Sequence, residues 1–297
     1  MTSSDETFSD RILNFTLPAR HARGRAVRLD GVADAILSAH DYPLGLRHVL
    51  AEALVLTALM GSLLKQEDGQ LTIQAQTEGG IVDLLVCDYR GGELRGYARF
   101  DRARADEIGP QPTLEALFGI GYLAVTFDLD ESDQRYQGVV PLEGGSLTEA
   151  CEAYFAQSEQ LPTLLRVGVQ TGPEGTVAAG LLLQHLAEGE EGRERLHVRL
   201  DHPEWEHVAI MGGSIKHGEL VDRDLSMEAL VWRLFHEEDE VRAERGAPVA
   251  RGCRCSADYY RSVLERFPAS EREEMRGDDG AITVDCAFCA REFPIDI

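Results

Sequence analysis

Four of the six cysteines in this chain lie in two tight pairs near its C-terminus. The first pair is Cys253-x-Cys255 and the second is Cys286-x-x-Cys289. Each pair can supply two corners of the tetrahedral, four-thiolate coordination that Zn²⁺ prefers in structural sites. The spacing therefore predicts a zinc cofactor, held by these four cysteines in a small C-terminal module.

The compartment of the protein affects how these cysteines are interpreted. Residues 1–15 contain early acids and no basic-then-apolar run, so we expect no secretory signal and a cytoplasmic location. In a reducing cytosol, clustered cysteines more often bind metal or undergo redox chemistry than form permanent structural disulfides. The thiols are therefore the leading functional clue.

The longest apolar stretch, residues 50–64, is interrupted by Glu52 and Thr57. It is also shorter than the ~20 residues that are needed to cross a bilayer. We expect a buried core helix here and no membrane partner.

The formal net charge of −23 disfavours nucleic acid and anionic membranes as partners, because both bind largely through Lys and Arg. The main alternative function is a zinc ribbon that contacts nucleic acid or the transcription machinery. Residues 253–297 contain six arginines against ten acids, so the zinc module lacks the basic surface that such a ribbon needs.

The pattern along the chain predicts an α+β fold, with a mainly antiparallel sheet packed by helices. Helical sequence covers residues 31–66, with a break near Tyr42-Pro43, where proline disfavours helix at the preceding residue. Short β-favouring runs separated by glycine pairs in residues 71–101 indicate a meander of about three strands. Two further strands are expected within residues 122–142, around the polar turn at residues 131–133.

The second half of the core has one clear helix start and one ambiguous segment. Ser146 and Glu149 form a capping-box pattern before an amphipathic helix. Residues 163–170 favour a strand, whereas residues 176–186 fit a buried strand or a buried helix equally well.

Composition changes after residue 187 to charge-dense, helix-favouring sequence. We therefore expect an N-terminal α/β core domain at 1–187, a helical linker region at 188–250 and a C-terminal zinc-binding redox-switch domain at 251–297. The linker has scattered apolar residues among many charges, so it could form an ordinary helical layer on the core or expose apolar patches to a partner.

The two remaining cysteines have a different setting. Cys87 lies in the apolar strand pattern "DLLVCDY", and Cys151 lies on the apolar face of the helix that follows Ser146. We interpret both as core residues and not as reactive thiols.

The four-cysteine pattern alone allows two uses. One is a purely structural zinc knob. The other is a redox switch, because zinc-bound thiolates are oxidisable and each has a neighbour that can trap it as a disulfide. A module of this size depends on its metal for folding, so loss of zinc should unfold it. Its expected apolar backing is a helix after Ser256, with Tyr259, Val263 and Phe267 at helical spacing.

Catalytic motifs are weak. The segment "MGGSIKHGEL" has glycines and a lysine but does not match a phosphate-binding loop, and the chain has no G-x-S-x-G nucleophile elbow. We expect no enzyme activity and assign no catalytic residues.

Beyond the cysteines, several long segments resemble the thirty-three-kilodalton redox-regulated heat-shock chaperone family of zinc-binding holdases. The segments are "HDYP", "DLLVCDY", "LRGYARFD", "LFGIGYLAVTFD", "YQGVVPLEGGSLTEACEAYFAQSEQLPT", "AAGLLLQHL" and "RLFHEED". The resemblance covers nearly the whole chain. The segment "LLLQHLAEG" lacks a proline that the family pattern has nearby, and the N-terminal extension is polar.

The resemblance implies a chaperone that is inactive when reduced and zinc-bound. It implies that oxidants such as hypochlorous acid, or peroxide with heat, form disulfides within the two cysteine pairs, release zinc and unfold the C-terminal part. The activated form would dimerise and hold unfolded or partly folded client proteins without ATP. Cys253, Cys255, Cys286 and Cys289 would then be both zinc ligands and redox-active disulfide cysteines.

Overall fold

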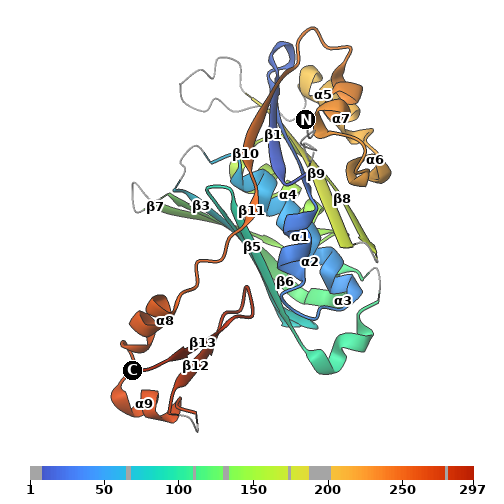
Figure 1. Ribbon diagram of the computed structural model, residues 1–297. Coiled ribbons are helices and arrows are strands. Elements are labelled where there is room, and N and C mark those ends of the chain that lie inside the picture. The colour runs from blue at the N-terminus through green and yellow to red at the C-terminus, as the bar shows by residue number, and fades with distance from the viewer. Residues whose placement is uncertain are drawn as a thin grey trace.

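The protein has an α+β fold, as the sequence predicts, with two mainly antiparallel sheets, several helices and a small C-terminal module (Figure 1). The computed structural model describes residues 9–64, 68–109, 112–129, 134–172, 175–186, 202–277 and 280–297. The predicted turn at residues 131–133 and the start of the predicted linker, residues 188–201, lie outside these residues.

The first sheet, sheet A, has the strand order β10-β1-β2-β9-β8. Every neighbouring pair in it is antiparallel. Its strands are β1 (Arg11–Leu17), β2 (Ala22–Leu29), β8 (Thr163–Gly172), β9 (Gly175–His185) and β10 (Arg242–Pro248).

The second sheet, sheet B, has the order β11-β5-β4-β3-β6-β7. It contains the predicted meander and the two further strands, and its only parallel pair among the described residues is the short contact of β11 with β5. Its strands are β3 (Gln70–Gly79), β4 (Val82–Arg90), β5 (Glu93–Phe100), β6 (Gly119–Leu129), β7 (Gln134–Pro141) and β11 (Ala250–Arg251).

Helix α2 (Leu44–Gly61) lies between the two sheets and forms the centre of the main core (Figure 1). It follows Pro43, as predicted, and 83% of it is buried. Its length and composition would also suit a membrane span, but burial on all sides shows that it is a core helix. The buried Glu52 carboxylate accepts hydrogen bonds from the N–H and the hydroxyl of Thr148, at 2.8 and 2.6 Å.

Short helices complete the main body. Ser146 caps the predicted helix by accepting a hydrogen bond from the Glu149 N–H, while the Glu149 carboxylate accepts one from the Gly145 N–H. These helices are η1 (Pro18–Arg20), α1 (Gly31–Leu37), η2 (Arg102–Glu107), α3 (Leu114–Phe118), α4 (Leu147–Tyr154) and the π-helical turn η4 (Phe155–Glu159).

Three helices cover the outer face of sheet A and are called the helical layer below: α5 (Pro203–Gly213), α6 (His217–Val221) and α7 (Met227–Phe235). Trp205, Leu230 and Phe235 are buried against strand residues such as Phe15. Strand β9 is therefore covered by α2 on one face and by the helical layer on the other. This two-sided burial is why its sequence showed no period that could separate strand from helix.

A buried arginine joins the helical layer to the sheet. Arg28 of β2 is 1% exposed, and its guanidinium donates hydrogen bonds to the backbone oxygens of Leu220 and Leu225 at 2.9 and 2.6 Å. A charged donor that is buried this deeply stabilises the fold only while those carbonyls remain in place.

Two features differ from the sequence prediction. Strands β1 and β2 were not predicted. Three arginines make β2 look polar, and Arg11, Asn14 and Thr16 are mixed with the apolar residues of β1. The region 188–250 was expected to be helical, but residues 242–248 form strand β10 on the edge of sheet A. The division of the chain into domains at residues 187 and 250 stays a prediction.

We expect Arg28→Met to lower the free energy of unfolding of the reduced protein by about 2–4 kcal/mol, because the buried carbonyls lose their charged donor. Urea unfolding followed by tryptophan fluorescence measures this loss. The control is Arg99→Met, because the Arg99 side chain is 61% exposed and should matter little. Equal effects of the two changes would contradict the anchoring role of Arg28.

Candidate metal centre

The C-terminal module brings the two cysteine pairs together from two kinds of local structure. Cys253 and Cys255 lie in the extended segment between β11 and α8. Cys286 and Cys289 lie in the turn of a hairpin, which the Cys286 N–H closes by donating to the Arg291 oxygen at 2.9 Å. The elements of the module are α8 (Ala257–Leu264), α9 (Ala269–Glu274), β12 (Ile282–Asp285) and β13 (Glu292–Ile295).

The local sequence explains this geometry. Ser256 begins α8 by accepting a hydrogen bond from the Tyr259 N–H at 3.1 Å, so the chain changes direction directly after Cys255. The hairpin turn places Ala290 at φ 55°, a left-handed conformation that reverses the chain directly after Cys289. The turn of this hairpin therefore presents both sulfurs on one side.

The four sulfurs converge on one point. The Sγ atom of Cys253 is 3.3 Å from that of Cys255 and 3.5 Å from that of Cys286, and Cys255 and Cys289 are also 3.5 Å apart. All four ligand atoms lie within 4.8 Å of one another. A disulfide would bring two sulfurs to ~2.05 Å, whereas a tetrahedral zinc with Zn–S bonds of ~2.3 Å separates them by ~3.8 Å. The donor set fits a four-thiolate zinc site in its reduced state.

Hydrogen bonds support a thiolate at one of the four positions. Burial raises the pKa of Cys286, but hydrogen bonds from the Tyr260 hydroxyl and the Cys289 N–H outweigh it and lower this pKa to about 6. Burial raises the pKa of Cys253 and of Cys255. A bound cation would favour the thiolate at all four.

The apolar core of the module is small. Among the described residues of the module, the buried members of this core are Leu264, Ile282 and Ile295, with partly buried neighbours such as Tyr260 and Phe293. The helix after Ser256 was predicted correctly, but the prediction of which helix face is buried was wrong. Tyr259 and Phe267 are 56% and 38% exposed, because Tyr260 and Leu264 face the hairpin instead. So thin a core makes the metal centre the main source of order here.

Residues between the paired cysteines contact the main body. Arg254, inside Cys-x-Cys, lies 3.7 Å from the buried carboxylate of Asp88 on β4. Phe288, inside Cys-x-x-Cys, lies under the guanidinium of Arg95, with the arginine carbon 4.0 Å from the ring centroid. Arg95 also donates a hydrogen bond to Asp88 at 2.7 Å. The sulfurs therefore face one another, while Arg254 and Phe288, called the spacer residues below, hold the module against sheet B.

A further contact joins the hairpin turn to the segment before α2. The Nε2 atom of His40 lies 2.7 Å from the backbone oxygen of Ala287. The sequence did not identify Arg254, Phe288 or His40 as functional. In the sequence, Arg254 and Phe288 lie between cysteines and His40 lies just before Tyr42-Pro43. Only the folded structure shows that these residues join the module to the main body.

The other two cysteines are not part of this cluster. Cys87 and Cys151 are fully buried in the main core, as predicted, and burial raises the pKa of both thiols. Neither is suited to form a thiolate.

Comparison with known proteins places these features in a family. The model of the family described as "Hsp33 protein" matches residues 10–296. The chain is 40% identical over 294 residues to a 33 kDa chaperonin of Caulobacter vibrioides, covering 97% of this chain and 95% of that protein. It is 34% identical over 272 residues to a 33 kDa chaperonin of Escherichia coli, covering 91% and 87%.

A solved structure shows the same fold. The crystal structure of a 33 kDa chaperonin from Thermotoga maritima matches with a TM-score of 0.78 and 23% identity, covering 96% of this chain and 94% of that one.

We expect the reduced protein to contain one zinc per chain and Cys286→Ser to lose most of it, because a hydroxyl replaces one of four thiolates. Metal analysis of the purified proteins measures this. The matched control replaces Cys87 and Cys151 with Ala, which should keep the zinc but cost about 1–3 kcal/mol of stability through lost packing. Full zinc retention in Cys286→Ser would contradict the assignment.

Proposed function

This chain belongs to the Hsp33 family, and we propose that it is a redox-regulated chaperone that holds unfolding proteins without ATP. A heat-shock chaperone role follows from the family. The observation that supports redox control is the convergence of four free thiols within 4.8 Å in a module that has almost no core of its own.

The reduced protein is the closed form in this proposal. Zinc, when bound, would fix four thiolates in one tetrahedron and so supply the folding energy that the module lacks, about 10–16 kcal/mol for structural sites. The residues that would hold it are Cys253, Cys255, Cys286 and Cys289. In this state the helical layer buries most of its large apolar side chains against sheet A.

Oxidation converts the closed form into an open form, because it changes the four cysteines that would hold the zinc. Cys253 and Cys255 join as one disulfide and Cys286 and Cys289 as the other, and each new S–S bond takes two electrons from its pair of sulfurs. An oxidant such as hypochlorous acid or peroxide accepts these electrons, and any thiol protons pass to water. Disulfide sulfurs are poor zinc ligands, so the site loses its metal. The close sequence spacing within each pair favours this local pairing.

Loss of the metal reaches the main body through the spacer residues. Arg254 and Phe288 are positioned by the cysteines on either side of them, and they hold the module against Asp88 and Arg95. An unfolded module would leave these contacts, and the adjoining linker would lose its C-terminal attachment. The helical layer would then loosen and expose its apolar face to clients.

Two large apolar residues of the helical layer are already exposed in the closed form. Ile210 is 64% exposed and Trp232 is 61% exposed. With the buried residues of the same layer they would form a client-binding surface after opening. We further propose, from the family resemblance, that the active form is a homodimer in the cytoplasm, with no nucleic acid, membrane or enzymatic substrate as partner.

Hydrogen exchange should separate the two states. We expect oxidation to raise exchange in residues 253–297 and in the helical layer, while α2 stays protected because it lies inside the main core. A light-scattering assay with a heat-denatured client should show protection by the same oxidised sample. Suppressed aggregation with unchanged exchange beyond residue 202 would contradict opening as the switch.

We expect Phe288→Ala to activate at a several-fold lower oxidant concentration, because the module loses its contact with Arg95. Zinc content of the reduced variant should be unchanged, since Phe288 is not a ligand. Titration with hypochlorous acid, followed by client protection, measures the shift. The matched control is Phe267→Ala, an exposed aromatic of the same module. An identical threshold for Phe288→Ala and wild type would exclude this contact from the switch.

A further inference from the structure

One short segment, residues 242–251, covers an edge of each sheet and is called the strap below. Its first part, β10, pairs with β1 at the edge of sheet A, and its last two residues, β11, pair with β5 at the edge of sheet B. It connects the helical layer to the metal centre, and Cys253 follows it after a single glycine.

The strap is a weak occupant of the β1 edge. The sequence of β10 is RAERGAP, and none of its side chains is buried. Glycine and proline are poor strand formers, and glutamate and alanine are also depleted in strands. Its ion pair of Arg245 with Glu228, at 2.8 Å, is exposed on both sides and adds little. The strap is therefore held mainly by its backbone pairing with β1, by a hydrogen bond that the Arg11 guanidinium donates to the Gly246 oxygen, and by the buried side chain of Val249.

Strand β1, with which the strap pairs, is well suited to bind an extended chain. In β1 the residues Ile12, Leu13, Phe15 and Leu17 are all at most 3% exposed. Its pairing with β10 is interrupted by a register shift between Arg11 and Leu13. An apolar strand with an unpaired edge is a template for another extended chain.

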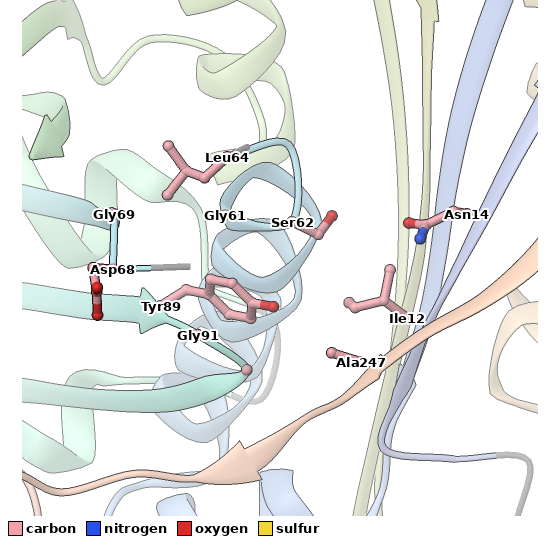
Figure 2. Close-up of a pocket in the computed structure, with 11 residues that line it drawn as sticks. Ile12, Asn14, Gly61, Ser62, Leu64, Asp68, Gly69, Tyr89, Gly91 and Ala247 are labelled. Atoms are coloured by element: carbon pink, nitrogen blue, oxygen red, sulfur yellow. The ribbon is translucent and has the colours of Figure 1, made fainter. Parts of the chain in front are cut away.

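A pocket opens beside the strap at this register shift. It has a volume of about 540 Å³ and lies between the end of α2, the turn after β4 and the edge of sheet A. Figure 2 shows Tyr89 on one side, Ile12 and Asn14 on the other, and Ala247 of the strap beside them. The methyl group of Ala247 is too small to fill this space, so the native strap leaves it open.

We propose that the edge of β1, once the strap has left it, binds an extended segment of a client protein as an added antiparallel strand. A large apolar side chain of the client, at the place of Ala247, would enter the pocket between Ile12 and Tyr89. Backbone hydrogen bonds would give affinity for many sequences, and the pocket would favour segments with such a side chain. This inference rests on the proposed function, which supplies the opened state.

The C-terminal end of the strap lies close to the cysteines, so unfolding of the module can release it from the sheets. The Gly252 N–H donates to the Leu94 oxygen at 2.9 Å, and the Ala250 N–H donates to the Gly92 oxygen at the same distance. Both bonds lie within three residues of Cys253. Unfolding of the C-terminal module frees this end of the strap, and the client strand then competes with a segment that buries no side chain in β10.

The test uses the oxidised full-length protein and two labelled peptides. Each has seven residues, the length of β10, with alternating valine and threonine and a phenylalanine at the place of Ala247. The second peptide is N-methylated at the residues whose N–H groups would face β1. Both have the same apolar side chains, but only the first can add as a strand. Fluorescence anisotropy should show binding that is about tenfold or more weaker for the methylated peptide, through loss of several hydrogen bonds.

Two substitutions at one position locate the site. Ala247→Phe lets the native strap fill the pocket and hold the edge, so it should weaken peptide binding several-fold. Ala247→Asp cannot fill the pocket and should bind at least as well as wild type. Zinc release on oxidation, measured beside binding, should be the same in both variants. Hydrogen exchange of residues 11–17 should rise on oxidation and fall again when the unmethylated peptide is added.

The outcomes separate this inference from the proposed function. If the oxidised protein suppresses client aggregation but binds both peptides equally, or if Ala247→Phe has no effect, strand addition is wrong while the chaperone function stands. Lasting protection of residues 11–17 in the oxidised protein, without peptide, would show that the strap or a second copy still covers the edge, and either result would also overturn it. If oxidation produces no protection against aggregation, the proposed function fails and this inference with it.

Discussion

The convergence of four thiols is the constraint on which the C-terminal module depends. Among its described residues, the apolar cluster of the module has three buried members, Leu264, Ile282 and Ile295, which is too little apolar surface to order a unit of this size. The cysteines replace the missing core by joining two distant segments, and their spacers Arg254 and Phe288 set the module against sheet B. One centre therefore orders the module internally and also attaches it to the rest of the chain.

The main body has a different source of order. Helix α2 is enclosed between two sheets, and Arg28 connects sheet A to the helical layer through buried hydrogen bonds. A body with this large core can stay folded when the module does not. The two parts are joined by the strap and by the contacts of Arg254, Phe288 and His40. This difference in stability would let a chemical event at the cysteines change the surface without unfolding the whole protein.

Features that depend on local pattern could be predicted from the sequence. Paired cysteines, the cap at Ser146 and the apolar run of α2 each have a direct physical signature. Strand β10 could not be predicted, because its arginines, glycine and proline oppose strand formation and only the open edge of β1 makes it a strand. The choice of Tyr260 over Tyr259, and the meeting of Phe288 with Arg95, depend on how separate elements dock.

Removal of zinc without oxidation tests the central claim most directly. The reduced, fully thiol-containing protein would be treated with a chelator while its backbone amide NMR signals are followed. The account predicts that the signals of residues 253–297 collapse to unfolded positions, that those of α2 stay in place, and that added zinc restores the first set. Unchanged signals from the module after complete zinc removal would show that the four cysteines do not hold it folded.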